Sequence, residues 1–229
     1  MDVAQVMLTY TSDSSASLVD ELADEISKLP GSRPAYGCKV DLSKVDGPQA
    51  VLAGLDAWLG PDSRVDILVN NAAVEVVKGL GEIGTSDYDK VYNLNVRGPI
   101  LLTQAILPRF NQSNNRIINI GSVGARCGFA KLGLYCSSKA ALEGLTRCWA
   151  AEMGSNGTTV NQVNPGPVQT AMLDNIPMDI VDLQKMRTPV QNRVGTVEEI
   201  ARIVSWLASP ESSWVSGQVI SASGGLEFY

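Results

Sequence analysis

The chain has 229 residues, 45% of them apolar and 18% charged, which predicts a folded globular protein with a sizeable core rather than a disordered one. Its net charge of −6 argues against nucleic acid or an anionic membrane as the main partner, and no apolar run is long enough to span a bilayer. Because histidine is absent, Ser-His-Asp catalysis, Cys-His catalysis and histidine-ligated metals are excluded, and we expect no metal site.

The four cysteines show no paired spacing of the CxxC kind; they are Cys38, Cys127, Cys136 and Cys148. Scattered cysteines of this sort indicate reduced thiols in a cytosolic protein. The first residues show neither the basic region nor the apolar core of a signal peptide. We therefore expect a cytoplasmic protein whose partner is a small molecule, with neither nucleic acid nor membrane involved.

Apolar stretches typical of strands alternate along the chain with stretches that place apolar residues on one helical stripe. Strands are expected at residues 3–10, 36–42, 65–70, 117–120, 158–164 and 217–222. Helices are expected at residues 15–29, 49–59, 86–110, 135–153 and 197–207, with an irregular segment at 171–192. This alternation predicts a doubly wound, mostly parallel, Rossmann-like α/β sheet with helices on both faces. No linker or repeat divides the chain, so we expect one domain over residues 1–229.

The stretch from Ile117 to Lys139 concentrates groups suited to proton transfer. Ser122 follows a short apolar strand, and a Gly-rich loop then leads to a helix that carries Tyr135 and Lys139. Because residues i and i+4 of a helix share a face, the phenol and the ammonium group point the same way. The carboxyl ends of strands are where open α/β sheets bind ligands. A hydroxyl, a phenol and an ammonium group at such an edge predict proton transfer to or from a substrate oxygen.

Several motifs in one order make the chain resemble the short-chain dehydrogenase/reductase family. They are Asp41, Asn70-Asn71-Ala72-Ala73, Asn95, Ser122, Tyr135-x-x-x-Lys139 and Pro165-Gly166-Pro167-Val168-x-Thr170. The segment from Asn192 to Gly225 also resembles that family's C-terminal part, so the resemblance covers nearly the whole chain. It implies an enzyme that reduces a carbonyl group, or oxidises an alcohol, of an apolar small molecule.

The resemblance implies catalytic roles for Asn95, Ser122, Tyr135 and Lys139. Tyr135 is expected to be the general acid or base, and Ser122 to hold the substrate oxygen by a hydrogen bond. A free phenol has a pKa of about 10, and we expect the neighbouring Lys139 to lower the pKa of Tyr135. Lys139 is also expected to hold the nicotinamide ribose.

Asn95 is expected at a break in its helix, where its main-chain carbonyl holds a water that feeds protons to Lys139. Pro99, four residues later, has no N–H with which to bond that carbonyl. We hypothesise that Pro99 leaves the Asn95 carbonyl free for this water. A kink without a functional role is the alternative.

The resemblance also implies a dinucleotide site. Its expected residues are Thr11, Ser12, Asp41, Leu42, Asn70, Ala72, Tyr135, Lys139, Pro165, Gly166, Val168 and Thr170. Asp41 is expected to accept from the adenine amino group, and Thr170 to contact the nicotinamide carboxamide. The strand that ends at Tyr10 continues with hydroxyl residues rather than an acid, which suits a 2′-phosphate, so NADP is the expected cofactor.

The family's first strand, its Thr-Gly-x-x-x-Gly-x-Gly turn and its first helix have no counterpart here, because residues 3–26 resemble the family's second strand and second helix. That turn supplies N–H groups to the pyrophosphate. The sheet is therefore expected to be truncated or rearranged at the N-terminus. Either the first remaining strand takes the central position, which we favour, or it keeps its family position beside a gap.

Three functional interpretations follow. The first is an NADP-dependent oxidoreductase whose N-terminus is absent from this sequence. The second is a natural variant, without a bound cofactor, that uses Ser122, Tyr135 and Lys139 for an isomerisation, dehydration or cyclisation; Met1 suits a genuine start and keeps this alternative open. The third is a non-catalytic binding protein, against which the joint presence of the catalytic residues argues.

Residues 171–192 are expected to form a substrate lid, with a loop packed on the core as the alternative. Its apolar residues favour an apolar ligand; they are Met172, Leu173, Ile176, Met178 and Met186. The resemblance also implies a homodimer or homotetramer, built through the helices that carry Asn95 and Tyr135.

Overall fold

The computed structural model describes residues 5–173, 176 and 178–228. Contacts group the chain into two compact units. The N-terminal unit comprises residues up to Arg64 together with Arg97–Arg109, and the C-terminal unit comprises Val65–Val96 and residues from Phe110 onward. A single domain over residues 1–229 stays a prediction.

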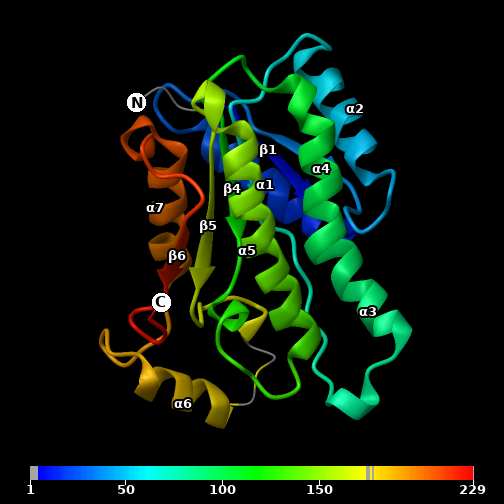
Figure 1. The fold of residues 1–229 in the computed structure, drawn as a ribbon. Helices are drawn as coiled ribbons and strands as arrows, with labels where there is room; N and C mark the ends of the chain where they lie inside the picture. Colours follow the sequence, from blue (N-terminus) through cyan, green and yellow to red (C-terminus); the bar gives the residue numbers. More distant parts are fainter. Residues whose placement is uncertain (1–4, 174–175, 177, 229) are drawn as a thin grey trace. The chain divides into compact units, whose positions relative to one another are not determined.

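The N-terminal unit contains two parallel strands, β1 (Met7–Tyr10) and β2 (Tyr36–Lys39), and three helices, α1 (Ala16–Ser27), α2 (Gly47–Leu59) and α4 (Gly98–Ile106). These elements run from blue to green in Figure 1. The predicted helix at residues 15–29 forms as α1, but Leu18, Leu22 and Leu29 on its apolar stripe are exposed. Of the strand predicted at 3–10, residues 3 and 4 lie outside the described residues.

The interior of the N-terminal unit lies between β2 and α2. Val51 and Leu55 of α2 are buried, and so is Cys38 of β2. Gly54 permits this packing, because a Cβ at that position would lie 2.8 Å from the Cys38 Sγ. At the end of α4, the Arg109 Nη1 donates to the Asp56 Oδ1 of α2 over 2.6 Å.

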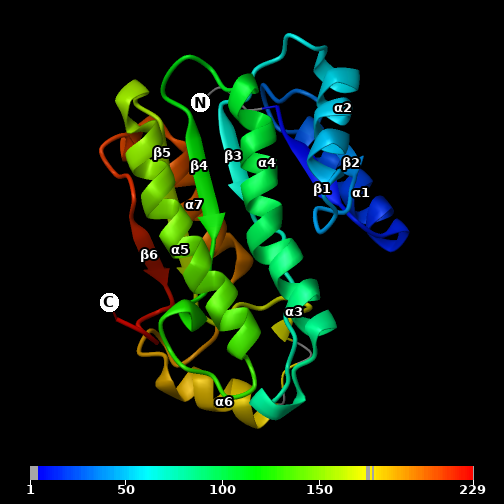
Figure 2. The same ribbon diagram turned by 45° about the vertical axis from the view of Figure 1, so that its right-hand side comes forward.

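The C-terminal unit is built on four parallel strands in the order β3-β4-β5-β6. The strands are β3 (Ile67–Asn70), β4 (Arg116–Ile120), β5 (Thr159–Pro165) and β6 (Val219–Ala222). The helices of this unit are α3 (Thr85–Tyr92), α5 (Gly133–Met153), α6 (Met178–Arg187) and α7 (Val197–Ala208). Figure 2 shows α5 in front of the strands and α7 behind them.

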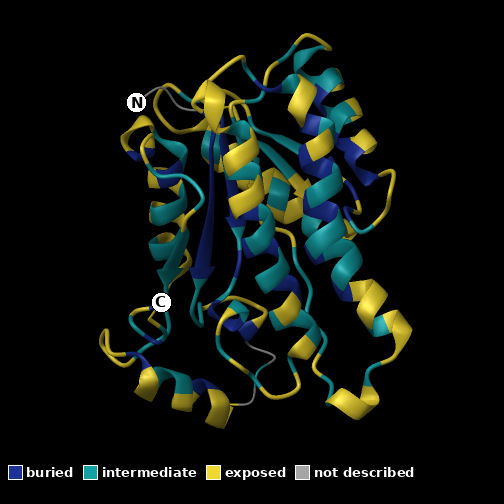
Figure 3. Ribbon diagram, viewed as in Figure 1, coloured by how far each residue is buried: buried dark blue, intermediate teal, exposed yellow. Residues whose placement is uncertain are grey.

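The strand register explains why α5 and α7 cover opposite faces of this sheet. Successive side chains of a strand point to opposite faces. Ile118 and Val163 form a buried apolar cluster with Leu207 of α7. Asn119, the residue after Ile118, instead donates to the Thr146 Oγ1 of α5. Strand β5 is buried between the two helices along nearly its whole length, as its dark colour in Figure 3 shows.

The structure confirms an α/β Rossmann-like fold with parallel strands, and corrects two expectations about its elements. The helix predicted at 86–110 is broken by a π-helical segment, Asn93–Arg97, because α-helical hydrogen bonding is interrupted ahead of Pro99. The segment 171–192, predicted to be irregular, contains helix α6, whose acidic first turn and basic last turn favour a helix. Residues 174, 175 and 177 of that segment lie outside the described residues.

Strand pairing is seen within each unit. Over the described residues, β1 pairs with β2 in the N-terminal unit, and β3-β4-β5-β6 form the sheet of the C-terminal unit. The position of β1 relative to β3, which we expected to be central, stays a prediction.

Two features of composition can be compared with the fold. All four cysteines are free thiols, as expected. Over the described ranges, no helix combines the length and the apolar character that a membrane crossing requires. The cytoplasmic location stays a prediction.

Candidate active site

Ser122 lies just beyond the carboxyl end of β4. Its main-chain N–H donates to the Asn164 Oδ1 over 3.1 Å, and its Oγ accepts from the Gly124 N–H, also over 3.1 Å. The residue before it must be glycine, because a Cβ on Gly121 would overlap the side-chain amides of Gln162 and Asn164. The backbone at Ser122 is therefore held by side chains of β5.

Tyr135 and Lys139 lie one turn apart on α5, on the same side of the helix as predicted. The Lys139 Nζ is 5.7 Å from the centre of the Tyr135 ring and donates to the Ile120 carbonyl over 2.7 Å. The side chain of Lys139 is only 2% exposed. The lysine thus connects the phenol to the end of β4, where Ser122 begins its turn.

Burial determines how these two groups titrate. It lowers the pKa of Lys139 to about 8, because the ammonium form loses its hydration. Burial also raises the pKa of Tyr135; a hydrogen bond with Ser122 opposes this rise, while Glu75 and Cys136 add to it. The net direction for Tyr135 is therefore opposite to the lowering that we expected, because burial is the largest influence on the pKa of the phenol.

Asn95 lies in the π-helical segment and is 1% exposed. Its Oδ1 accepts from the Val74 N–H over 2.9 Å, and its Nδ2 donates to the Val74 carbonyl over 2.8 Å and to the Ser138 Oγ over 3.0 Å. Ser138 in turn donates to the Tyr135 carbonyl over 2.7 Å. The helix break was anticipated, but this side-chain bridge to α5 was not. A water held on the Asn95 carbonyl stays a prediction.

Glu75 is a site residue that the sequence reasoning missed. It lies one residue beyond Val74, whose backbone Asn95 holds, and it is partly buried. Burial raises the pKa of its carboxyl group, and its charge is one of the influences that raise the pKa of Tyr135. Its place two residues after the Asn70-to-Ala73 motif was the only available signal.

Apart from Tyr135 and Lys139, the expected cofactor residues of the C-terminal unit lie at or just beyond the ends of β3 and β5. Asn70 is buried and donates its Nδ2 to the Asn119 Oδ1 over 2.9 Å, so its side chain points into the protein, whereas Ala72 is exposed. Gly166 donates its N–H to the Ala222 carbonyl over 3.0 Å. A Cβ on Gly166 would lie only 3.0 Å from the Ser223 Cα, so the close approach of the two backbones requires glycine.

The segment after Pro165 contacts the backbone at Gly195. Val168 forms an isolated parallel bridge with Gly195. Thr170 is exposed, and its Oγ1 donates to the Val168 carbonyl over 3.3 Å. Pro165, Gly166, Val168 and Thr170 thus lie in one short segment at the end of β5, and their roles stay predictions.

In the N-terminal unit, Thr11 and Ser12 follow β1, and Asp41 and Leu42 follow β2. The carboxyl ends of these two strands are adjacent, because the Val40 N–H donates to the Tyr10 carbonyl over 2.7 Å. Leu42 is buried, whereas Asp41 is exposed and accepts from the N–H and the Oγ of Ser43. Those hydrogen bonds from Ser43 are the main cause of the lowered pKa of Asp41.

Hydroxyl groups gather where β1 leads into α1. The Ser12 Oγ lies 2.9 Å from the Ser14 Oγ and 2.8 Å from the Ser15 Oγ. Asp13, between them, forms an ion pair with Lys39 at the end of β2. The sequence reasoning missed Lys39, although its place on a strand next to Asp41 was a usable signal.

The segment expected to be the substrate lid includes α6, which lies on the side of the C-terminal unit to which the strand arrows point in both Figure 1 and Figure 2. Leu173 is buried, whereas Met172, Met178 and Met186 are exposed, the last two to 69% and 70%. Among the described residues, no group of three His, Cys, Asp or Glu side chains is placed to hold a metal ion.

Comparisons with known proteins identify the family. A family model described as enoyl-(acyl carrier protein) reductase matches residues 2–227. Dehydrogenase OXI1 of Cochliobolus heterostrophus is 40% identical over 227 residues, which cover 97% of each chain. The chain belongs to the short-chain dehydrogenase/reductase family.

Solved structures of similar fold carry a nicotinamide cofactor. One is a blue fluorescent protein from a metagenomic library in complex with NADPH, with a TM-score of 0.89 and 36% identity, covering 98% of this chain and 88% of that one. Another is the angucycline C-6 ketoreductase LanV with bound NADP, with a TM-score of 0.88 and 29% identity, covering 97% and 86%. The comparisons lend no support to the cofactor-independent alternative.

Proposed function

We propose that this protein is an NADP-dependent oxidoreductase that reduces a carbonyl group, or oxidises the corresponding alcohol, of an apolar small molecule. The observation that carries the proposal is the gathering of Ser122, Tyr135 and Lys139 at the carboxyl end of β4. A hydroxyl, a phenol and an amine in this arrangement suit proton transfer to an oxygen atom whose charge changes during reaction.

The raised pKa of Tyr135 keeps the phenol protonated at neutral pH, as a general acid for carbonyl reduction requires. Ser122, which hydrogen-bonds the phenol, orients the substrate oxygen beside the proton that it receives. Lys139, with a pKa of about 8, lies where it can return a proton to the phenolate. A bound NADPH supplies the hydride.

The residues at the ends of β1 and β2 fit the 2′-phosphate end of NADP. The hydroxyls of Thr11, Ser12, Ser14 and Ser15 offer hydrogen bonds, and Lys39 offers a cation that already binds the carboxylate of Asp13. We propose that Asp41 and Leu42 contact the adenine. This fit concerns the N-terminal unit by itself.

Within the C-terminal unit, we propose that Asn70 and Ala72 line the ribose on the adenine side and that Lys139 holds the nicotinamide ribose. The turn from Pro165 to Thr170 would hold the carboxamide. Asn95 positions Val74 and, through Ser138, the first turn of α5. We also propose that its main-chain carbonyl holds the water that supplies protons to Lys139.

The proposal also covers the class of substrate and the assembly. The exposed methionines of the segment around α6 favour an apolar substrate, because flexible thioether side chains adapt to irregular apolar surfaces. We further propose a homodimer or homotetramer built through α5 and the helix that carries Asn95. A monomer in light scattering at micromolar concentration would contradict this assembly.

The test combines binding and turnover. We expect NADPH titration to raise nicotinamide fluorescence, and NADPH to reduce a carbonyl probe such as phenanthrenequinone. Replacing Tyr135 by Phe should lower kcat by about 10²- to 10⁴-fold without loss of NADPH binding, because only the transferable proton is removed. Tyr88→Phe, which removes an exposed phenol from α3, is the matched control and should keep full activity.

Two results would overturn the proposal. The first is the absence of NADPH binding up to millimolar concentration. The second is a Tyr135→Phe enzyme that turns over as fast as the unmodified protein.

A further inference from the structure

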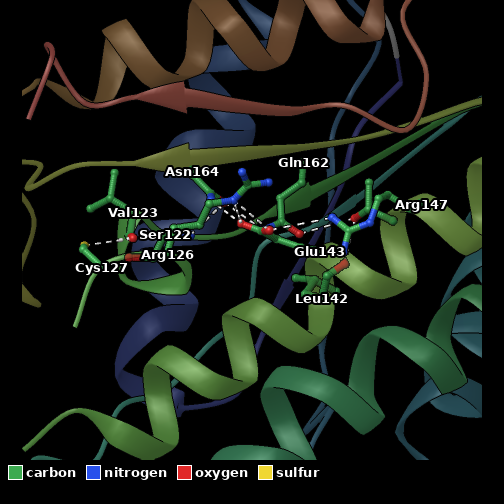
Figure 4. A network of polar contacts seen from close by, with 10 residues as sticks. Ser122, Val123, Arg126, Cys127, Leu142, Glu143, Arg147, Gln162 and Asn164 are labelled. Carbon is green, nitrogen blue, oxygen red and sulfur yellow. Dashed lines mark hydrogen bonds and ion pairs between the residues drawn. The ribbon is translucent and has the colours of Figure 1, made fainter. Parts of the chain in front are cut away.

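A buried carboxylate lies behind Ser122 and has no role in the chemistry described above. Glu143, on the face of α5 that meets the sheet, is 6% exposed. Its Oε1 accepts from the Asn164 Nδ2 of β5 over 2.9 Å. Figure 4 shows the carboxylate within a group of polar side chains that joins α5, β5 and the turn at Ser122.

Two arginines balance the negative charge of Glu143. The Arg126 Nε, on the loop between Ser122 and Tyr135, lies 3.1 and 3.0 Å from the two carboxylate oxygens. The Arg147 Nη1, one turn further along α5, lies 3.8 Å from one of them. Both arginine side chains are partly exposed, whereas the side chain of Glu143 is buried.

The carboxylate determines which way the Asn164 amide points. An ionised carboxylate only accepts hydrogen bonds, so Asn164 must turn its Nδ2 toward Glu143. The Oδ1 of the same amide then faces the opposite way, toward two donors. It accepts from the Ser122 N–H over 3.1 Å and from the Gln162 Nε2 over 2.7 Å.

We propose that Glu143 and Asn164 are a positioning pair, which sets the backbone of Ser122 and thereby aims its hydroxyl at the substrate oxygen. The proposal rests on the proposed function for the role of Ser122, but its structural part does not depend on turnover. The hydrogen bond between Glu143 and Asn164 sets the orientation of the Asn164 amide. The Oδ1 of that amide then accepts from the Ser122 N–H and sets the position of the Ser122 backbone.

Stability alone does not account for this cluster. Apolar side chains of similar volume fill buried space without the desolvation that a carboxylate suffers, and replacing buried ionic groups in this way is often neutral or stabilising. A small displacement of a catalytic group, in contrast, lowers the rate by up to about 10²-fold. We therefore infer that the polar cluster, which ends on the amide of Ser122, orients the backbone of that residue.

Asn164→Asp gives the sharpest test, because it replaces the amide donor with a second carboxylate of nearly the same shape. At neutral pH, the introduced carboxylate would face Glu143 and repel it, so we expect kcat with NADPH and phenanthrenequinone to fall by about 10- to 100-fold. As the pH is lowered, one proton shared by the two carboxyl groups restores a donor between them. The activity of the variant relative to the unmodified enzyme should therefore rise toward acid pH.

Three other charged side chains lie near the Glu143–Asn164 pair. Arg126 faces Glu143 from the loop, and Arg147 and Lys139 lie on α5, whereas Gln162, which contacts Asn164 on β5, is uncharged. Tyr135 titrates above neutral pH, so its transition lies on the other side of the profile.

The double variant Glu143→Gln with Asn164→Asp reverses the pair while keeping its hydrogen bonds. The amide introduced on α5 donates to the carboxylate introduced on β5, and that carboxylate still accepts from the Ser122 amide. We expect this swap to recover most of the lost kcat and to abolish the acid rise. Glu152→Gln, at an exposed position of the same helix, is the matched control for loss of one negative charge and should leave kcat unchanged.

Hydrogen–deuterium exchange of the cofactor-free protein separates this inference from the proposed function. We expect the Ser122 amide to be protected in the unmodified chain, to exchange at least about tenfold faster in Asn164→Asp, and to regain protection in the swap. If the unmodified enzyme shows no turnover but the exchange pattern holds, the proposed function fails and the positioning pair stands. If Asn164→Asp keeps full kcat, or the swap is no better than the single variant in both assays, the inference is overturned.

Discussion

The two faces of the β3–β6 sheet differ in what they bury. On the face that α7 covers, Ile118, Val163 and Leu207 form an apolar cluster. On the face that α5 covers, Asn119 and Gln162 occupy the positions next to Ile118 and Val163 in the same strands, and both are fully buried.

The polar face is a connected row rather than a set of isolated groups. Asn70 of β3, Asn119 of β4 and Gln162 of β5 are neighbours in the strand register. Asn70 donates to Asn119, Asn119 donates to Thr146 of α5, and Gln162 donates to Asn164. A parallel sheet covered on both faces ordinarily has apolar residues on both. The difference teaches that one face is held to α7 by apolar packing, while the other is joined to α5 by hydrogen bonds.

The largest expected effect on stability comes from the apolar face. Leu207→Ala leaves a cavity next to Ile118 and Val163, and we expect it to lower the free energy of unfolding by about 2–5 kcal/mol. Activity per folded molecule should not change, because the cluster lies on the face that α7 covers. Denaturant unfolding and kcat at a temperature where the variant stays folded would test both statements. A loss of kcat in the folded Leu207→Ala variant would contradict the conclusion that the apolar face contributes to stability alone.

A smaller loss of stability, joined to a loss of activity, is expected on the polar face. Thr146→Val removes the hydroxyl that accepts from Asn119, so the buried Asn119 Nδ2 loses its partner. We expect unfolding to become easier by about 1–3 kcal/mol, with a lower kcat per folded molecule as the row loosens. Ile118→Val is the matched control on the other face and should cost about 0.5–1.5 kcal/mol without a change in kcat. Equal effects of the two variants on kcat would contradict the division of roles.

The smallest expected effect is a shift in the pH dependence of activity when Glu75 is replaced. The negative charge of Glu75 helps to raise the pKa of Tyr135, so Glu75→Gln should lower that pKa. In the reduction direction, which needs the protonated phenol, the alkaline limb of the kcat profile should move to lower pH. In the oxidation direction, activity should appear at lower pH. We expect a shift of less than about one pH unit, with no shift for Glu152→Gln; a shift toward higher pH would show that Glu75 does not act through its charge.

Local patterns carried much of the fold and of the catalytic motif. The alternation of strands and helices predicted the α/β class, because apolar periodicity depends on neighbouring residues alone. The spacing of Tyr135 and Lys139 placed both on one side of α5 for the same reason. Helix α6 was missed because methionines and prolines obscured its pattern, and the break before Pro99 was anticipated without its π-helical form.

The amino-acid sequence by itself determined the parallel α/β class, the family motifs and the turn at Ser122, since each depends on residues close together in the chain. Only the tertiary structure decided what surrounds them. Asn164 meets Glu143 across 21 residues and Ser122 across 42, and Asn95 meets Val74 across 21. The same holds for the pKa of Tyr135, which rises because burial outweighs the hydrogen bond with Ser122. Burial and hydrogen-bond partners arise when distant segments pack together, and no local pattern records that packing.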